Sequence, residues 1–271
     1  MDGQKIMADN KEKIIRFYKG TEGEETAVRL VDLAGRAQKS GRFALTDFLS
    51  PYEQEIAETV AVNFPSLTVS FSGGYLGAER QRAMFIDKDF AEHCGELPFE
   101  IAAVKALWRS EFVRVGHRDV LGAVLGLGLE RGKVGDIIAT GESAKILVDE
   151  KIAEFLLGNL TEIGAASVNT ELCDLSSIEP HEERVKEISA TVASLRVDAV
   201  AAAGFGMSRS KAAADVAADK LKLNWQRVKN AAQQIKEGDM LSMRGRGRVE
   251  VTKIRGTTKK GRIGLDLKRY I

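Results

Sequence analysis

The chain has little of what would mark a redox, metal-binding or membrane protein. Its 271 residues include two cysteines, Cys94 and Cys173, four prolines and three histidines. Neither cysteine has a partner at a metal-ligand spacing, so we expect two buried thiols in a reducing compartment, with no zinc site and no disulfide framework. The longest apolar stretch, residues 120–129, is too short to cross a membrane, and no signal peptide is recognisable. We expect a cytoplasmic protein without a membrane partner, metal or cofactor.

Catalytic signatures are also missing from the sequence. It contains no Gly-x-Ser-x-Gly elbow, no Walker loop and no paired-carboxylate pattern. The glycines of residues 126–132 resemble a dinucleotide-binding loop, but they end an expected helix where such a loop would open one. We interpret them as a helix terminus and turn. Nothing in the sequence demands an enzyme.

Positive charge is concentrated at the C-terminal end. Residues 191–271 hold 18 lysines and arginines against seven aspartates and glutamates, a net charge of +11, whereas residues 1–190 hold 22 against 32, a net charge of −10. A basic segment of this kind attracts a polyanion. Because apolar residues alternate within it, we expect a folded basic domain and not a solvated tail.

Residues 195–242 predict a helix-turn-helix followed by strands. The first helix is expected over residues 197–203, stopped by Gly204 and Gly206. The second starts at Ser208, a good N-cap, and runs to about residue 218. Arg209 and Lys211 fall in its first turn, where they oppose the helix dipole. An anionic ligand would explain cations at that position.

Further cations and hydrogen-bond donors follow in the same segment. We expect them to contact phosphate groups of structured RNA, whose shape would set the binding site because side chains cannot easily read the deep major groove of A-form RNA. We do not expect DNA as a partner. The candidate RNA-binding residues are Arg196, Ser208, Arg209, Lys211, Lys220, Lys222, Asn224, Arg227, Lys229, Arg244 and Arg246.

At these residues the stretch resembles the RNA-binding domain named after the fourth protein of the small ribosomal subunit, the S-four domain. The resemblance rests on the Leu-Arg-Val-Asp opening, the Ser-Arg-x-x-Ala helix start, the strand that ends in Leu-Asn and the Gly-Asp turn. Asp219 and Trp225 depart from the family pattern, since they stand where most or many members have glycine. Aspartate tolerates a left-handed turn. Trp225 either stacks on a base or covers the small core.

The remaining residues predict an α+β protein. Residues 1–64 are expected to form a small helical N-terminal unit, in which residues 43–51 are a loop that packs on the neighbouring domain and Ser50 and Pro51 start the last helix. Residues 65–180 begin with a hairpin and continue as a ferredoxin-like, RRM-like βαββαβ domain. Residues 181–271 are expected to hold a linker helix and the S-four-type αα-β domain.

The middle domain also offers candidates for a second RNA contact. Arg80 and Arg82 lie beside glycines, where a phosphate contact and a surface ion pair with Glu79 are both open interpretations. His117 and Arg118 stand at the start of a helix, where a capping role and an RNA contact are both open.

A second resemblance covers roughly residues 10–260. It rests on the run His-Arg-Asp-Val-Leu-Gly-Ala at residues 117–123, on Gly-Gly-Tyr at 73–75, on Ala-Glu-Arg at 78–80 and on residues 46–51. With the C-terminal domain, these segments look like the YlmH-type proteins. That family is encoded in the cell-division region of many Gram-positive bacteria and has cyanobacterial and plastid relatives called photosystem II S-four domain proteins.

The resemblance implies a non-enzymatic protein that binds rRNA and tRNA on the large ribosomal subunit and acts in the rescue of stalled ribosomes. Cell-division and photosystem-assembly phenotypes are attached to the family. The implied location is the cytoplasm, or the plastid stroma if a transit peptide has been removed, and we expect a monomer.

Two other functions stay open. S-four domains are often fused to pseudouridine synthases, but those enzymes typically carry the domain at the N-terminus and have a catalytic Asp in a Gly-Arg-Leu-Asp setting, which this sequence lacks. The other alternative is a scaffold in which the basic domain meets an acidic protein partner.

Overall fold

The computed structural model describes residues 11–109, 114–179 and 185–270. The chain divides into two compact units, residues 1–181 and 182–271. None of the helices in the described part of the chain combines the length and the apolar character needed to span a membrane. The two cysteines are unpaired. We expected both to be buried, but each is only half-buried.

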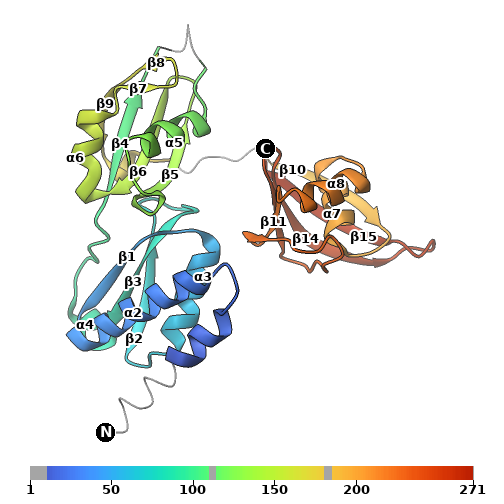
Figure 1. Cartoon of the computed structure of the whole chain (residues 1–271), viewed down its shortest axis with the longest axis horizontal. Coiled ribbons are helices and arrows are strands. Elements are labelled where there is room, and N and C mark those ends of the chain that lie inside the picture. Colours follow the sequence, from blue (N-terminus) through green and yellow to red (C-terminus); the bar gives the residue numbers. More distant parts are fainter. Residues whose placement is uncertain (1–10, 110–113, 180–184, 271) are drawn as a thin grey trace. The chain divides into compact units, whose positions relative to one another are not determined.

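The N-terminal part of the first unit contains a three-stranded antiparallel sheet whose strands have the order β1-β3-β2. These strands are β1 (Phe43–Leu49), β2 (Leu67–Ser72) and β3 (Gln81–Asp87), and they are followed by the short helix α4 (Lys88–His93). Helices α2 (Glu24–Ser40) and α3 (Pro51–Val62) cover one face of the sheet (Figure 1). Helix α3 begins as predicted, with Ser50 and Glu53 forming a capping box and Pro51 in the first turn.

Strand β1 and the β2–β3 hairpin correct the predicted N-terminal unit. Residues 43–49 form a strand paired with β3 and not a loop. Leu67 and Phe85 of the hairpin share one hydrophobic core with Leu30 and Ile56 of the helices. A boundary at residue 64 would cut through this core, so the N-terminal part is an α/β layer that includes the hairpin. The strand that pairs with β1 lies far along the chain, where a local pattern cannot indicate it.

The second part of the first unit has the predicted ferredoxin-like order. Its elements are β4 (Ile101–Leu107), α5 (His117–Gly126), the 3-10 turn η1 (Arg131–Lys133), β5 (Val134–Ala139), β6 (Ser143–Asp149), α6 (Glu150–Asn159), the small hairpin β7 (Glu162–Ile163) and β8 (Ala166–Ser167), β9 (Asn169–Cys173) and η2 (Leu175–Ser177). The antiparallel sheet has the order β5-β6-β4-β9, and α5 and α6 pack on one face. Gly128, with a φ of 85°, follows the end of α5, which confirms a helix terminus there.

The other face of this middle sheet is covered by the N-terminal part and by η2. Phe48 of β1 packs with Ala103 of β4, Leu147 of β6 and Ile178, which follows η2. A Cβ atom on Gly135 would lie 2.7 Å from the Phe48 ring, so the strand needs glycine there. The predicted packing of residues 43–51 on the neighbouring domain is thus confirmed, although the segment is a strand. Bases cannot stack on this buried part of the sheet in the way that RRM domains use theirs.

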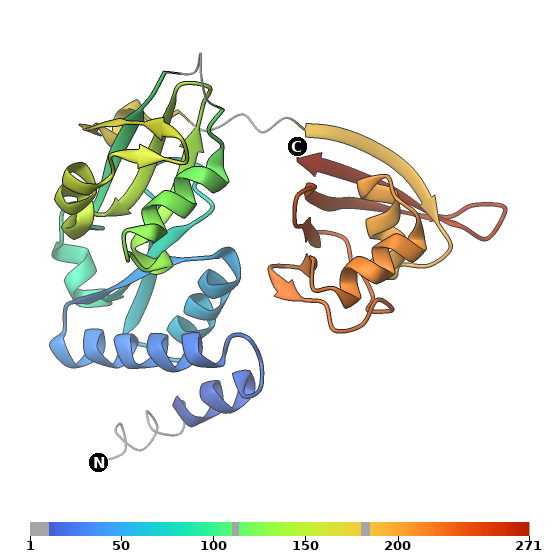
Figure 2. The same ribbon diagram turned by 45° about the horizontal axis from the view of Figure 1, so that its top comes forward.

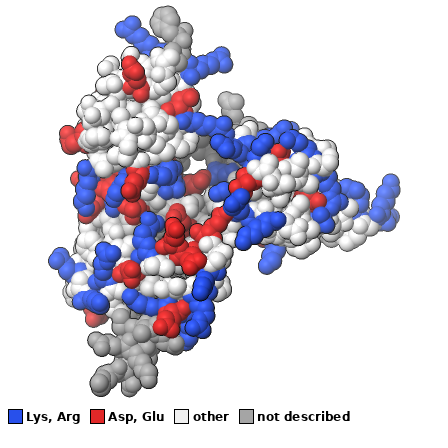
Figure 3. All heavy atoms as spheres, viewed as in Figure 1, with Lys and Arg blue, Asp and Glu red and all other residues white. Residues whose placement is uncertain are grey.

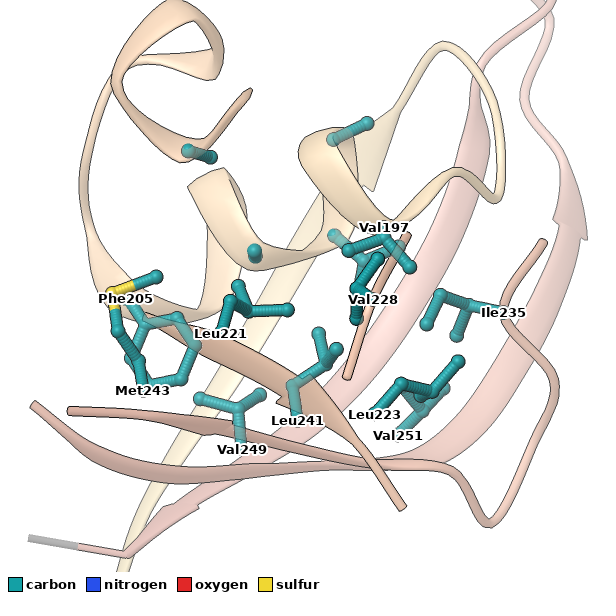
Figure 4. Packing of buried hydrophobic residues seen from close by; sticks show 14 of the residues in the cluster. Val197, Phe205, Leu221, Leu223, Val228, Ile235, Leu241, Met243, Val249 and Val251 are labelled. Atoms are coloured by element: carbon teal, nitrogen blue, oxygen red, sulfur yellow. The ribbon is translucent and has the colours of Figure 1, made fainter. Parts of the chain in front are cut away.

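The second unit packs two helices against a six-stranded antiparallel sheet. Its elements are β10 (Val185–Val192), α7 (Val197–Phe205), α8 (Arg209–Ala217), β11 (Leu221–Leu223), β12 (Gln226–Arg227), β13 (Met240–Met243), β14 (Gly247–Thr257) and β15 (Ile263–Tyr270), and the sheet order is β10-β15-β14-β13-β11-β12. Figure 4 shows Val197 and Phe205 of α7 meeting Leu241, Val249 and Val251 of the sheet. The β14–β15 hairpin extends beyond the helices of this unit (Figures 1 and 2).

Two details of this unit differ from the prediction. The expected linker helix is strand β10, which pairs along its whole length with β15. Alternation of Ile188, Ala190 and Val192 fits a strand, and the partner lies at the far end of the chain. Gly204 lies inside α7, where a Cβ would come within 2.6 Å of Val249, and the left-handed Gly206 ends the helix.

Candidate nucleic-acid interface

Two basic residues surround a buried aspartate at the start of the helix pair. Asp198, in the first turn of α7, is only 4% exposed. Arg196 donates to both of its carboxylate oxygens, at 3.2 and 3.0 Å, and Nε of Arg209 lies 3.1 Å from Oδ2. Ser208 caps α8 by accepting a hydrogen bond from the backbone N–H of Lys211, as predicted. The first helix turn therefore holds Arg209 against the preceding helix.

A second buried aspartate, near the C-terminal end of α8, pairs with two lysines. Asp215, also 4% exposed, has Oδ1 at 2.7 Å from Nζ of Lys211 and 3.8 Å from Nζ of Lys220. Arg244 lies beside this group, since its backbone N–H donates to the carbonyl oxygen of Lys220. The Lys211–Asp215 pair has the i,i+4 spacing that stabilises helices, a sequence signal that the prediction did not use.

These contacts correct the explanation offered for cations at the start of α8. Burial raises the pKa of Asp198, but hydrogen bonds from Arg196 and Arg209 outweigh that effect and leave its pKa lowered. The hydrogen bond from Lys211 lowers the pKa of Asp215. The countercharge therefore comes from the protein. Because each carboxylate holds two cations, each cluster keeps a net charge of +1 and presents its cations in fixed positions.

Four other candidate cations are exposed. Within residues 185–270, no ion-pair partner is found for Lys222, Lys229, Arg244 or Arg246. Figure 3 shows basic side chains over much of the visible face of this unit, with few acidic ones among them. Such groups are free to contact phosphate oxygens.

Two further candidates, Arg227 and Asn224, differ in whether their side chains can contact a phosphate. Arg227 is exposed and donates to Asp219 at 2.6 Å, a surface pair that water screens. Asn224 is committed to the fold, because its Nδ2 donates to Asp239 and its Oδ1 accepts from the backbone N–H of Met240. We therefore withdraw Asn224 as a phosphate contact.

The structure also removes two residues from the second predicted contact. Arg82 is 4% exposed, donates to the carbonyl oxygens of Thr46 and Glu100, and lies 3.6 Å from Asp149. Arg80 is half-buried and donates to the carbonyl oxygens of Phe48 and Val134. Both arginines bind the N-terminal sheet to the middle sheet.

His117 and Arg118 remain exposed at the start of α5. Partial removal of water from the imidazole, together with the neighbouring Arg131, lowers the pKa of His117 and so favours the neutral ring. Of these two, only Arg118 brings a full positive charge.

One group of cations was missed because its members are separated from the helix pair in sequence. The extended β14–β15 hairpin carries five exposed basic side chains on β14 and at its tip: Lys253, Arg255, Lys259, Lys260 and Arg262. Asp266 pairs with Arg255 at 3.3 Å. The sequence signal was the charge of the Thr-Thr-Lys-Lys turn.

Comparison with known proteins assigns a class to this arrangement. Three family models match the chain: "YlmH, N-terminal" over residues 22–90, "Putative RNA-binding domain in YlmH" over residues 96–177 and "S4 domain" over residues 195–241. The class is thus that of proteins with a C-terminal S4 RNA-binding domain. This agrees with the helix pair and its basic surface.

The relatives give the particular family. The Bacillus subtilis (strain 168) protein "Ribosome-associated protein quality control protein P2" is 39% identical over 232 residues, which cover 86% of this chain and 89% of that protein. The chain belongs to the YlmH family, and the resemblance seen in the sequence is confirmed. A solved structure, "Cell division protein ylmH from Streptococcus pneumoniae", shares the fold over 58% of this chain and 95% of its own, with a TM-score of 0.50 and 23% identity.

Proposed function

We propose that this protein binds structured RNA on the large ribosomal subunit and acts, without catalysis, in the quality control of stalled ribosomes. The observation that carries the proposal is the basic surface of the S4 unit. Two buried aspartates position four cations there, and four more are exposed and have no ion-pair partner within residues 185–270. The name of the B. subtilis relative supports the ribosomal setting. We further propose rRNA and tRNA as the RNA, the cytoplasm as the location and a monomer as the active form.

The test uses the free cations, because reversing them leaves the aspartate clusters intact. We expect Lys222→Glu/Arg244→Glu to release the full-length protein from the large subunit in a sucrose gradient of native lysate. The matched control is Arg36→Glu/Lys39→Glu, which reverses two exposed charges on α2. The control should sediment like the wild type. Wild-type protein that stays at the top of a low-salt gradient would remove the ribosome from the proposal.

Purified RNA gives a second readout. If both substituted residues contact phosphates, the slope of log affinity against log salt should become shallower by about 2, since each lost phosphate contact reduces it by about 1. An unchanged slope would remove these residues from the interface. In a native pull-down, a partner that survives nuclease treatment would favour the scaffold alternative.

A further inference from the structure

Trp225 occupies a backbone conformation that a tryptophan rarely adopts. It is the second residue of the two-residue turn between β11 and β12, whose last paired residues are Leu223 and Gln226. Both turn residues have positive φ, 48° at Asn224 and 61° at Trp225. Turns of this kind favour Asn followed by Gly, because a side chain at the second position is strained. The Asn is present here, and the Gly is replaced by the bulkiest side chain.

The hydrophobic core does not explain this tryptophan. Among the described residues of the second unit, Trp225 belongs neither to the buried core nor to the half-buried apolar residues that pack against it, such as Leu195 and Met207. It is itself half-buried. Within the described residues, its indole N–H has no hydrogen-bond partner. The choice left open by the sequence is thus decided against a core role.

The turn is held firmly and lies between cations. Asn224 ties it to β13 through Asp239 and through both backbone groups of Met240. Lys222 and Arg227, the cross-strand pair next to the turn, are both exposed. A fixed aromatic ring between cations is the arrangement with which proteins hold single-stranded nucleic acid, since the ring stacks on a base while the cations hold the flanking phosphates.

We propose that Trp225 is a stacking platform for an unpaired nucleobase, so that the S4 unit binds RNA at a loop or bulge beside a helix. This inference rests on the proposed RNA-binding function and deepens it, because phosphate contacts alone do not distinguish unpaired from paired RNA. The backbone strain at Trp225 is then the cost of placing a ring where a base can reach it.

The test compares two RNA probes, a hairpin with an unpaired loop and a blunt duplex of the same stem, with full-length protein. We expect Trp225→Gly to weaken binding of the hairpin by about 5-fold to 150-fold, the range that stacking of one base supplies, and to leave duplex binding unchanged. Trp225→Phe should retain most of the hairpin affinity. Gln226→Ala, which changes the exposed strand residue next to Trp225, is the matched control and should bind like the wild type.

Two further readouts separate stacking from a structural role. Because the chain has two tryptophans, a Trp108→Phe background leaves Trp225 as the sole indole, and its fluorescence should be quenched by the hairpin and much less by the duplex. Trp225→Gly relieves the strained φ, so the midpoint of thermal unfolding should not fall. A clear fall in the midpoint, with equal losses for both RNAs, would mean that the ring only supports the fold.

The outcomes also distinguish this inference from the proposed function. Wild-type protein that binds neither RNA would refute RNA binding itself. Wild-type protein that binds both RNAs, with Trp225→Gly binding them equally well, would leave RNA binding intact and refute the stacking platform. We would then expect the exposed part of the Trp225 ring to contact a protein partner and not a nucleobase.

Discussion

Substitution of Asp198 by Asn tests whether the buried carboxylate holds the helix pair together. Asn keeps the shape of the side chain and one acceptor oxygen but removes the charge that faces Arg196 and Arg209. Breaking a fully buried ion pair costs about 3–5 kcal/mol. The two arginine side chains are 35% and 48% exposed, so water screens the loss. We therefore expect a decrease of about 2 kcal/mol in the free energy of unfolding.

The assay is thermal unfolding of the full chain in the Trp108→Phe background, where Trp225 reports on the second unit. For a unit of fewer than 100 residues, about 2 kcal/mol corresponds to a midpoint lower by about 8–16 °C. The matched control is Asp219→Asn, which weakens an exposed pair with Arg227 and keeps a residue that tolerates its positive φ of 56°. Its cost should not exceed about 1 kcal/mol.

The pH dependence of the same difference gives a second check. The pKa of Asp198 is lowered in the folded state, so its contribution to stability is present above the unfolded pKa of about 3.9 and is lost as the pH falls through the folded pKa. The difference in the free energy of unfolding between wild type and Asp198→Asn should therefore become smaller below about pH 4. A variant that loses no more stability than Asp219→Asn at pH 7 would refute the role given to this carboxylate.

Two other substitutions test packing in the two units. Gly204→Ala places a Cβ 2.6 Å from the Val249 side chain, closer than van der Waals contact, and we expect urea unfolding to show a loss of about 1–3 kcal/mol in the free energy of unfolding. Gly256→Ala, which has open space around it, should be nearly neutral. Arg82→Met leaves Asp149 with less countercharge in a buried site and should cost about 3 kcal/mol without changing RNA affinity. An RNA affinity that falls while stability holds would restore Arg82 as an RNA contact.

Local sequence signals predicted the start of α3 and the helix pair of the S4 unit, although they indicated a helix where strand β10 lies. Ser50 with Glu53 and Ser208 at the start of α8 are caps made by residues within one turn, and Gly206 ends α7 because a left-handed residue is needed there. The ferredoxin-like order followed from the succession of expected strands and helices in residues 97–175. The physical determinants of these features lie within a few residues of one another, so the sequence alone shows them.

Strand pairing and side-chain partners were decided by the tertiary structure. Strands β1 and β10 form because β3 and β15 supply hydrogen bonds from distant parts of the chain. The same reason applies to Arg82, for which the sequence left a phosphate contact and a surface ion pair open. Its partners in the structure are Asp149 and the carbonyl oxygens of Thr46 and Glu100, which come from distant parts of the chain.

Some features of the candidate interface could likewise be predicted from the sequence, and others only from the tertiary structure. The net charge of +11 of residues 191–271 and the helix pair were readable from composition and short motifs. Which cations are held by Asp198 and Asp215, and that Trp225 lies outside the core, depend on groups that only the fold brings together. The charge of a side chain and its preference for helix or strand are properties of a single residue. Its ion-pair partner and its burial depend on neighbours that the fold brings together. The sequence therefore determined what this surface attracts, and the tertiary structure decided which side chains are free to contact it.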